Sequence, residues 1–276
     1  MGTYTEKTGM SLGELNEISQ NLVGAIFPEA NVLARASQYC YGSSAENYIY
    51  EMNKYGHQII WNYTDRWSDG RIIIYLLTDG RSTPPRAILA IKGSDNPLNF
   101  FGSNIARRDW IRNIFGKILG NPWKKAYQSS VKGVRELMRK NQNGKFAFFI
   151  TGHSAGGTLA QDISRKFNIP GASFCALGVN NRNFFSLDDD DIYLYHSAHS
   201  RFCNHVIEDE IAWIESGKNP ENFFGSIIRH YPWGKEMKKE SNPIALHMID
   251  HFIQHHFSPF PGGCPCNNDR CLRGKC

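Results

Sequence analysis

One stretch near the middle of the chain constrains the fold more than any other. An apolar segment, Phe146 to Thr151, runs directly into Gly152-His153-Ser154-Ala155-Gly156, and helix-forming residues continue to Phe167. A short, fully apolar run is typical of a strand that is buried on both faces. The glycines at 152 and 156 lack the Cβ atoms that would collide in a very tight turn. The stretch therefore predicts a buried strand, a sharp turn at Ser154 and a helix from Ala155.

Strand-like and helix-like segments alternate along the rest of the chain. Further strands are predicted at 57–63, 71–77, 86–92, 172–177 and 192–196, and further helical segments at 10–27, 31–55, 124–141 and 243–257. This alternation is typical of an α/β fold, with a mostly parallel central sheet and helices on both faces. We expect a single domain over residues 1–257, with the helical segment 10–55 packed on it, and an irregular tail over 258–276.

The composition is that of a globular protein. Hydrophobic residues make up 41% of the 276 residues and charged residues 21%, which allows a substantial core. The formal charge is only +5, and the basic residues are scattered in short pairs. Nucleic-acid-binding proteins usually gather such charge into one stripe, so we expect no nucleic-acid partner. A solvated basic surface is the simpler interpretation, and weak attraction to an anionic lipid surface is the alternative.

Targeting signals are not evident in the sequence. The first twenty residues are polar, unlike a secretory signal peptide, and no apolar stretch reaches the length of a membrane span. We therefore expect a cytoplasmic protein, although export by another route would leave no readable mark.

Four of the seven cysteines crowd the last thirteen residues of the chain. They are Cys264, Cys266, Cys271 and Cys276. Their spacing lacks the paired C-x-x-C knuckles of zinc sites, so free thiols or disulfides are favoured, and no metal or cofactor is predicted. The other three, Cys40, Cys175 and Cys203, are expected to be buried thiols.

A serine between a buried strand and a helix is suited to nucleophilic catalysis. At the N-terminus of a helix, the dipole and the unpaired amides favour the oxyanion that forms when an ester carbonyl is attacked. The amide of Ala155 is one natural donor to that oxyanion. The strand–Ser–helix context is the one required for the nucleophile of a serine hydrolase with the α/β-hydrolase fold, and it predicts Ser154 as that nucleophile.

The same residues resemble a known family. Gly152 to Ala160 (GHSAGGTLA) resembles the GHSLGGALA motif of class 3 lipases, the fungal and plant triacylglycerol lipases. Ile91 to Ser94 (IKGS) resembles the family's F-R-G-T, and Asp109 to Ile114 (DWIRNI) is similar to its D-W-x-x-N segment. The resemblance spans roughly residues 86 to 252. It implies that Ser94 contributes the second oxyanion donor.

The base and the acid of a triad must follow the nucleophile in α/β-hydrolases, in the order Ser, Asp or Glu, His. Leu246 to Phe252 (LHMIDHF) resembles the family's H-x-x-x-x-Y, in which an aromatic packs below the catalytic imidazole. This implies His247 as the base, with His251 as its rival. For the acid, Asp209 fits the family's D-x-V, but the proline that should follow is missing. Glu208 and Glu210 flank Asp209 and leave this assignment open.

The resemblance implies an enzyme that hydrolyses lipid esters, such as acylglycerols, without a cofactor. Residues 97–123 mix aromatic and basic residues and could form a lid or a segment that contacts a lipid surface, or simply pack in the core. Residues 215–242 could shape the pocket. The alternative activities are a phospholipase A1 or lysophospholipase and a short-chain esterase. The alternative without catalysis is an inactive binding scaffold. The sequence gives no indication of oligomeric state.

Overall fold

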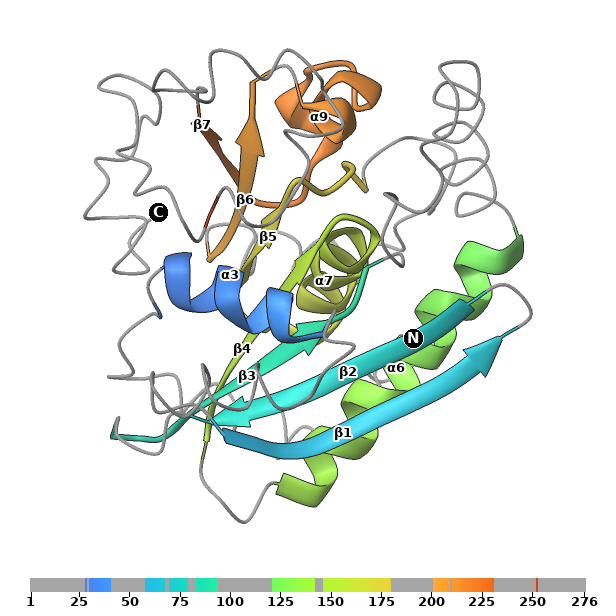
Figure 1. Cartoon of the computed structure of the whole chain (residues 1–276), viewed down its shortest axis with the longest axis vertical. Coiled ribbons are helices and arrows are strands. Elements are labelled where there is room, and N and C mark those ends of the chain that lie inside the picture. Colours follow the sequence, from blue (N-terminus) through green and yellow to red (C-terminus); the bar gives the residue numbers. More distant parts are fainter. Residues whose placement is uncertain are drawn as a thin grey trace, which may run out of the picture.

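The described residues form a seven-stranded sheet at the centre of the computed structural model, shown in Figure 1. The structure describes residues 28, 30–40, 58–67, 70–78, 83–93, 121–141, 146–179, 201–208, 210–230 and 252. The strands are β1 (Gln58–Trp67), β2 (Gly70–Thr78), β3 (Arg86–Ile91), β4 (Ala147–His153), β5 (Gly171–Phe174), β6 (Phe202–Ile207) and β7 (Ser226–His230).

The strands lie side by side in the order of the sequence. β1, β2 and β3 pair antiparallel, whereas β3 to β7 pair parallel throughout. The predicted mostly parallel sheet is therefore confirmed. Strand β4 is the fourth of the seven strands and is buried at every position, so its carboxyl end lies at the middle of the sheet edge.

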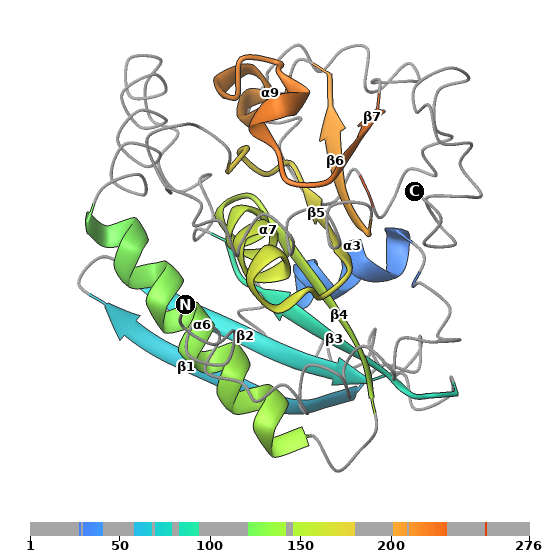
Figure 2. The ribbon, with the colours of Figure 1, turned by 180° about the vertical axis from the view of Figure 1, so that it is seen from behind.

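Helices cover both faces of the sheet, as expected. Helix α3 (Ala30–Tyr39) lies in front of the strands in Figure 1, and α6 (Asn121–Asn141) and α7 (Ala155–Phe167) lie in front of them in the reverse view of Figure 2. Strand β3 contributes side chains to the core on both faces of the sheet. Its Leu89 packs in the cluster that includes α6 and α7, and its neighbours Ile88 and Ala90 pack with α3.

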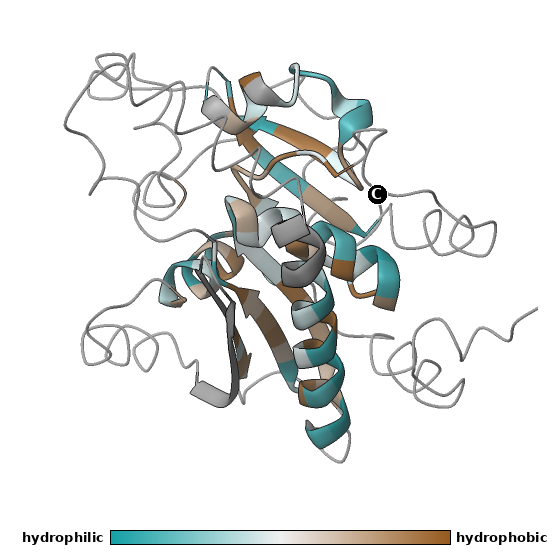
Figure 3. Ribbon diagram, turned by 90° about the vertical axis from the view of Figure 1, so that its right-hand side faces the viewer, coloured by the Kyte–Doolittle hydropathy of each residue, from teal (hydrophilic) through white to brown (hydrophobic). Residues whose placement is uncertain are grey.

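Helix α6 is amphipathic, as the sequence predicts. Val131, Val134 and Leu137 recur at helical spacing and are buried against the sheet. In Figure 3 the outer side of this long helix is largely hydrophilic and the strands behind it are hydrophobic. The helix begins at Asn121, three residues before the predicted start, so the last residues of the segment 97–123 are helical.

Two strands at one edge of the sheet were not predicted. The segment Phe202–Ile207, which follows the predicted strand 192–196 in sequence, is itself strand β6. Within 215–242, interpreted above as a pocket-shaping insertion, the structure places β7 and the 3-10 turn Pro220–Asn222, after the short helix α9 (Ile211–Glu215). Strand 192–196, helix 10–27 and the tail lie outside the described residues. Of the predicted helix 243–257 the structure describes only Phe252, which is helical.

No helix in the described part of the chain is both long and apolar enough to cross a bilayer. The three cysteines outside the tail are buried free thiols, as predicted.

Candidate active site

Ser154 occupies a strained turn between β4 and α7, which we call the serine turn (residues 152–156). Its φ is 56° and its ψ is −130°, on the side of backbone space that L-residues rarely adopt. The Ser154 amide donates to the Phe174 carbonyl of β5 at 3.0 Å, and the side chain does not cap the helix that it precedes. Such a strained conformation costs about 1–3 kcal/mol and persists only where the surrounding structure enforces it.

The glycines of the serine turn are required by close backbone contacts. A Cβ on Gly152 would lie 2.4 Å from the Gly156 carbonyl carbon, and a Cβ on Gly156 would lie 2.3 Å from the Ile91 carbonyl oxygen. No side chain fits at either position without moving the backbone. The turn can therefore be as tight as predicted only because both residues are glycine.

The start of α7 provides amides beside Ser154. Ala155 is the first residue of this 13-residue helix, so its amide has no acceptor within the helix. The chain that leaves β3 crosses at the same place, because a Cβ on Gly156 would also meet Lys92 and Gly93, at 2.7 and 2.8 Å. The next residue in the sequence is Ser94, which lies outside the described residues.

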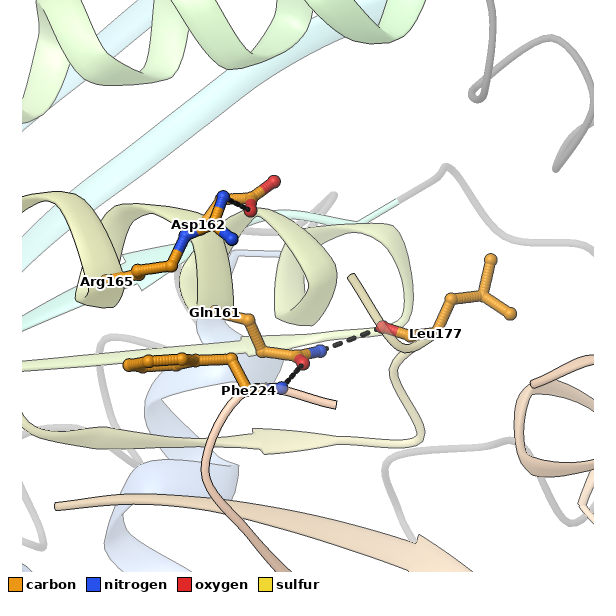
Figure 4. A network of polar contacts seen from close by, with 5 residues as sticks. All are labelled: Gln161, Asp162, Arg165, Leu177 and Phe224. Carbon is orange, nitrogen blue, oxygen red and sulfur yellow. Dashed lines mark hydrogen bonds and ion pairs between the residues drawn. The ribbon is translucent and has the colours of Figure 1, made fainter. Parts of the chain in front are cut away.

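Buried hydrogen bonds fix α7 to the chain that follows β5 and to the chain that precedes β7 (Figure 4). The Gln161 side chain donates to the Leu177 carbonyl at 2.8 Å and accepts from the Phe224 amide at 3.2 Å. One residue on, Asp162 accepts from Arg165 at 3.1 Å, and burial raises the pKa of this carboxyl group to about 6 in spite of the arginine. Gln161 could not be identified from the sequence, since a buried glutamine in a helix carries no recognisable signal.

The region predicted to carry the acid is a turn after β6, which we call the acid turn (residues 207–210). The Glu210 amide donates to the Ile207 carbonyl at 3.1 Å and closes the turn. Glu208 forms an ion pair with Lys218 at 3.0 Å. The Glu210 carboxylate is fully buried and accepts from the Ala212 and Trp213 amides at the start of α9. Asp209, the third residue of this turn in sequence, lies outside the described residues.

The Glu210 carboxylate also reaches back toward the end of β5. Cys175 follows that strand with a φ of 46°, and its amide donates to the His205 carbonyl at 2.9 Å. Burial, and then the neighbouring Glu210, raise the pKa of the Cys175 thiol well above its ordinary value. Cys175 therefore carries its proton at neutral pH.

Phe252 marks where the C-terminal segment meets the sheet. Its ring lies 5.1 Å from that of Phe174 and 5.4 Å from that of His230, centroid to centroid. Both partners lie at the carboxyl ends of their strands, β5 and β7. Phe252 therefore lies at the carboxyl edge of the sheet, the edge at which β4 leads into Ser154.

The structure brings together only some of the predicted site residues. Ser154 and Ala155 are adjacent at the serine turn, whereas Ser94, Asp209, His247 and His251 lie outside the described residues. Within the described ranges, no three His, Cys, Asp or Glu side chains are placed so that they could hold a metal ion.

Comparison with solved structures finds similarity to lipases. The nonglycosylated LIP2 lipase of Yarrowia lipolytica is 12% identical, with 82% of this chain and 81% of that chain covered and a TM-score of 0.45. Lipase II of Rhizopus niveus is 14% identical, with 80% and 82% covered and a TM-score of 0.40. A lipase of Rhizopus microsporus var. chinensis is 13% identical, with 80% and 75% covered and a TM-score of 0.44.

No protein-family profile and no curated protein sequence matches the chain. At such low identities and TM-scores, the similarity to solved lipases assigns neither a family nor an activity. The parallel sheet, with a strained serine turn between its middle strand β4 and helix α7, gives this chain the α/β-hydrolase fold.

Proposed function

We propose that the protein is a serine hydrolase of carboxylic esters, with Ser154 as its nucleophile. One observation carries the proposal, namely the strained backbone of Ser154, with its positive φ, between a central parallel strand and the start of a helix. This conformation has a cost and leaves the helix without a serine cap. A tight turn that exposes a nucleophile at the carboxyl edge of the sheet accounts for both.

The oxyanion would be stabilised by two backbone amides. The first is that of Ala155, at the positive end of the α7 dipole. The second is the amide of Ser94. This residue comes directly after Lys92 and Gly93, whose backbone packs against Gly156. Amides held in this way need not reorganise as charge develops on the substrate oxygen.

Asp209 is the proposed acid, since both of its rivals have other partners. Glu208 is paired with Lys218, and Glu210 is engaged in capping α9. An acid that caps a helix through both oxygens is poorly placed to orient an imidazole. These partners support Asp209 as the acid among the three neighbouring carboxylates.

His247 is the proposed base. Phe252 packs at the carboxyl ends of β5 and β7, and the aromatic of the H-x-x-x-x-Y pattern would lie in this way below the catalytic imidazole. His251, the rival, directly precedes the buried Phe252 in the sequence, whereas the pattern places the histidine five residues before the aromatic.

The reaction would proceed through an acyl-enzyme. Ser154 Oγ attacks the ester carbonyl carbon while His247 takes its proton, and the carbonyl oxygen becomes an oxyanion held by the amides of Ala155 and Ser94. His247 then gives the proton to the departing alcohol as the carbon–oxygen bond breaks. Water, deprotonated by His247, attacks the acyl-enzyme, releases the carboxylic acid product and regenerates Ser154. Asp209 orients His247 and stabilises its charged form.

Lipid esters are the proposed substrates, because the motif around Ser154 and the segments at 91–94 and 109–114 resemble those of class 3 lipases. The test is hydrolysis of p-nitrophenyl esters of short and long acyl chains by the wild type and by Ser154→Ala. We expect turnover that rises with chain length, or above the concentration at which the substrate aggregates, and that is lost in the variant.

Other outcomes separate the alternatives. A preference for soluble short-chain esters would indicate an esterase, and release of sn-1 fatty acid from phosphatidylcholine vesicles a phospholipase A1. The absence of turnover on all of these esters would contradict the proposed function and favour a binding scaffold.

A further inference from the structure

Four aromatic rings form a cluster at the carboxyl edge of the sheet, which we call the ring cluster (Phe174, His205, His230 and Phe252). Phe174 stacks on His205, with centroids 4.9 Å apart, and His205 stacks on His230 at 5.2 Å. These rings come from β5, β6 and β7, and the planes within each stacked pair differ by 20° and 19°. Three neighbouring strands thus build one continuous stack of rings.

Phe252 lies across this stack. Its ring meets those of His205 and His230 edge to face, at interplanar angles of 80° and 86° and centroid distances of 6.3 and 5.4 Å. It is buried, with 7% of its surface exposed. Edge-to-face contacts of this kind favour one orientation of the rings over others, beyond the effect of burial. The stack therefore defines where Phe252 sits.

The two histidines of the ring cluster are joined by a hydrogen bond. His205 Nδ1 and His230 Nε2 lie 2.9 Å apart, and each residue is only 6% exposed. One nitrogen must donate and the other accept, so at least one ring is neutral. Burial lowers the pKa of His205 well below its ordinary value and that of His230 to about 4. Near neutral pH the pair is uncharged, and it adds no charge beside the apolar Phe252.

The backbones of both histidines are fixed to the loops of the site. The His205 carbonyl accepts from Cys175, which follows the Phe174 that holds the Ser154 amide. The His230 carbonyl accepts from the Glu208 amide at 2.8 Å, within the acid turn. The ring cluster therefore has a fixed position relative to both the serine turn and the acid turn. Neither histidine belongs to the proposed triad, so this buried polar pair has no role in the mechanism above.

We propose that His205 and His230 are positioning residues. They fix the position of Phe252 and thereby place His247, five residues earlier in the sequence, within reach of Ser154. The inference rests on the proposed function. Two apolar side chains in place of the histidines would bury Phe252 equally well. The hydrogen bond between the two imidazoles, however, fixes the planes of both rings. It thereby fixes the direction from which Phe252 packs.

The test compares His230→Leu with His230→Gln in the full chain. Leucine removes the hydrogen bond and the ring, whereas the glutamine amide can reach the position of Nε2 and keep a partner for His205. We expect His230→Leu to lower kcat about 10- to 100-fold with little change in KM, since small misplacements of catalytic groups have effects of this size. We expect His230→Gln to recover most of that loss.

A double-variant cycle tests whether the effect passes through Phe252. We expect Phe252→Ala to lower kcat, and His230→Leu to have little further effect once Phe252 is gone, because coupled residues are not additive. Phe202→Leu is the matched control for lost core packing. Phe202 is a buried aromatic of β6, and it packs with Phe224 in the cluster that includes α7. The Phe202→Leu variant should have a lower melting temperature than the wild type and a kcat within twofold of the wild-type value.

An active wild type whose kcat is unchanged by His230→Leu, or a loss that simply adds to that of Phe252→Ala, would overturn the positioning role. An inactive wild type would instead contradict the proposed function itself.

Discussion

The backbone of Ser154 is the residue-scale feature on which the proposed function depends. A non-glycine residue with a φ of 56° is held by its surroundings, in this case by the hydrogen bond to Phe174 and by the two glycines of the serine turn. The strain is explained if the position is needed for chemistry, since strained residues concentrate at functional sites.

Ser154→Gly should therefore increase stability while it abolishes activity. Glycine adopts this conformation without a steric cost, and we expect the free energy of unfolding to rise by about 1 kcal/mol, measured by urea denaturation. Ser154→Ala, which keeps the Cβ and the strain, should leave stability nearly unchanged and be equally inactive. Equal stabilities of the glycine and alanine variants would show that the serine turn is not strained.

Gly156→Ala should distort the serine turn. Its Cβ would meet the backbone of Ile91 at 2.3 Å, which only a backbone shift can relieve. We expect a loss of about 2 kcal/mol or more and a large fall in esterase activity. Gly217→Ala is the matched control, because Gly217 has a φ of 68° but no atom within 4 Å of an added Cβ. It should cost about 1 kcal/mol and leave activity intact. A fully active Gly156→Ala would contradict the geometry.

Among single residues, the sequence could predict the tight turn at Ser154 but not the whole environment of that serine. Ser154 and its glycines form a contiguous motif, so their roles are readable locally. The proposed acid and base come from distant segments. Asp209 fits the family's D-x-V, but Glu208 and Glu210 flank it and leave the assignment open in the sequence. The partners of the two glutamates are known only from the folded chain, and for Asp209 and His247 the assignment stays a prediction.

At the scale of elements, the acid turn makes a sharp comparison possible. Asp209→Asn should lower kcat by about 10³- to 10⁴-fold, because asparagine favours the wrong tautomer of the base. Glu208→Gln removes an ion pair with the exposed Lys218, and such a pair contributes little, so kcat of this variant should match that of the wild type. The reverse result, with Glu208→Gln inactive and Asp209→Asn active, would reassign the acid to Glu208.

The strands show why pattern alone finds some elements and not others. Strands β1 to β5 and helix α7 were predicted because their apolar runs are uninterrupted or regularly spaced. Strand β6 contains Asn204 and His205 at fully or nearly fully buried positions, and so it does not read as an apolar strand. These polar groups are tolerated because they have partners. Asn204 accepts from Ser173 and donates to the Phe224 carbonyl, and His205 is bonded to His230. Such partners are known only from the fold.

At the scale of the whole molecule, buried titratable groups should make stability depend on pH. The His230 pKa is about 4 in the folded chain, against an ordinary value of 6.5, so below pH 6.5 the unfolded chain binds a proton that the folded chain does not. The contribution of His230 to the free energy of unfolding should therefore fall as the pH decreases from about 6.5 to about 4.

Asp162 acts in the opposite direction over an overlapping range. Its pKa is raised to about 6 from 3.8, so the stabilisation from its protonated form is present below pH 3.8 and lost as the pH rises through 6. The two contributions are separated by His230→Gln, which should flatten the acid-side decline in urea titrations between pH 4 and pH 7. A variant with the same pH dependence as the wild type would show that His230 does not titrate as described.

The proposed function requires Ser154, in the serine turn at the carboxyl end of β4, to be the reactive group of the molecule. The most direct test is to incubate the wild type with a fluorophosphonate, which phosphonylates activated serines, and to locate the adduct by peptide mass spectrometry. We predict a single adduct on Ser154, formed in step with loss of ester hydrolysis and absent in Ser154→Ala. Complete loss of hydrolysis with the adduct on another residue, or an active enzyme that is never labelled at Ser154, would contradict the account.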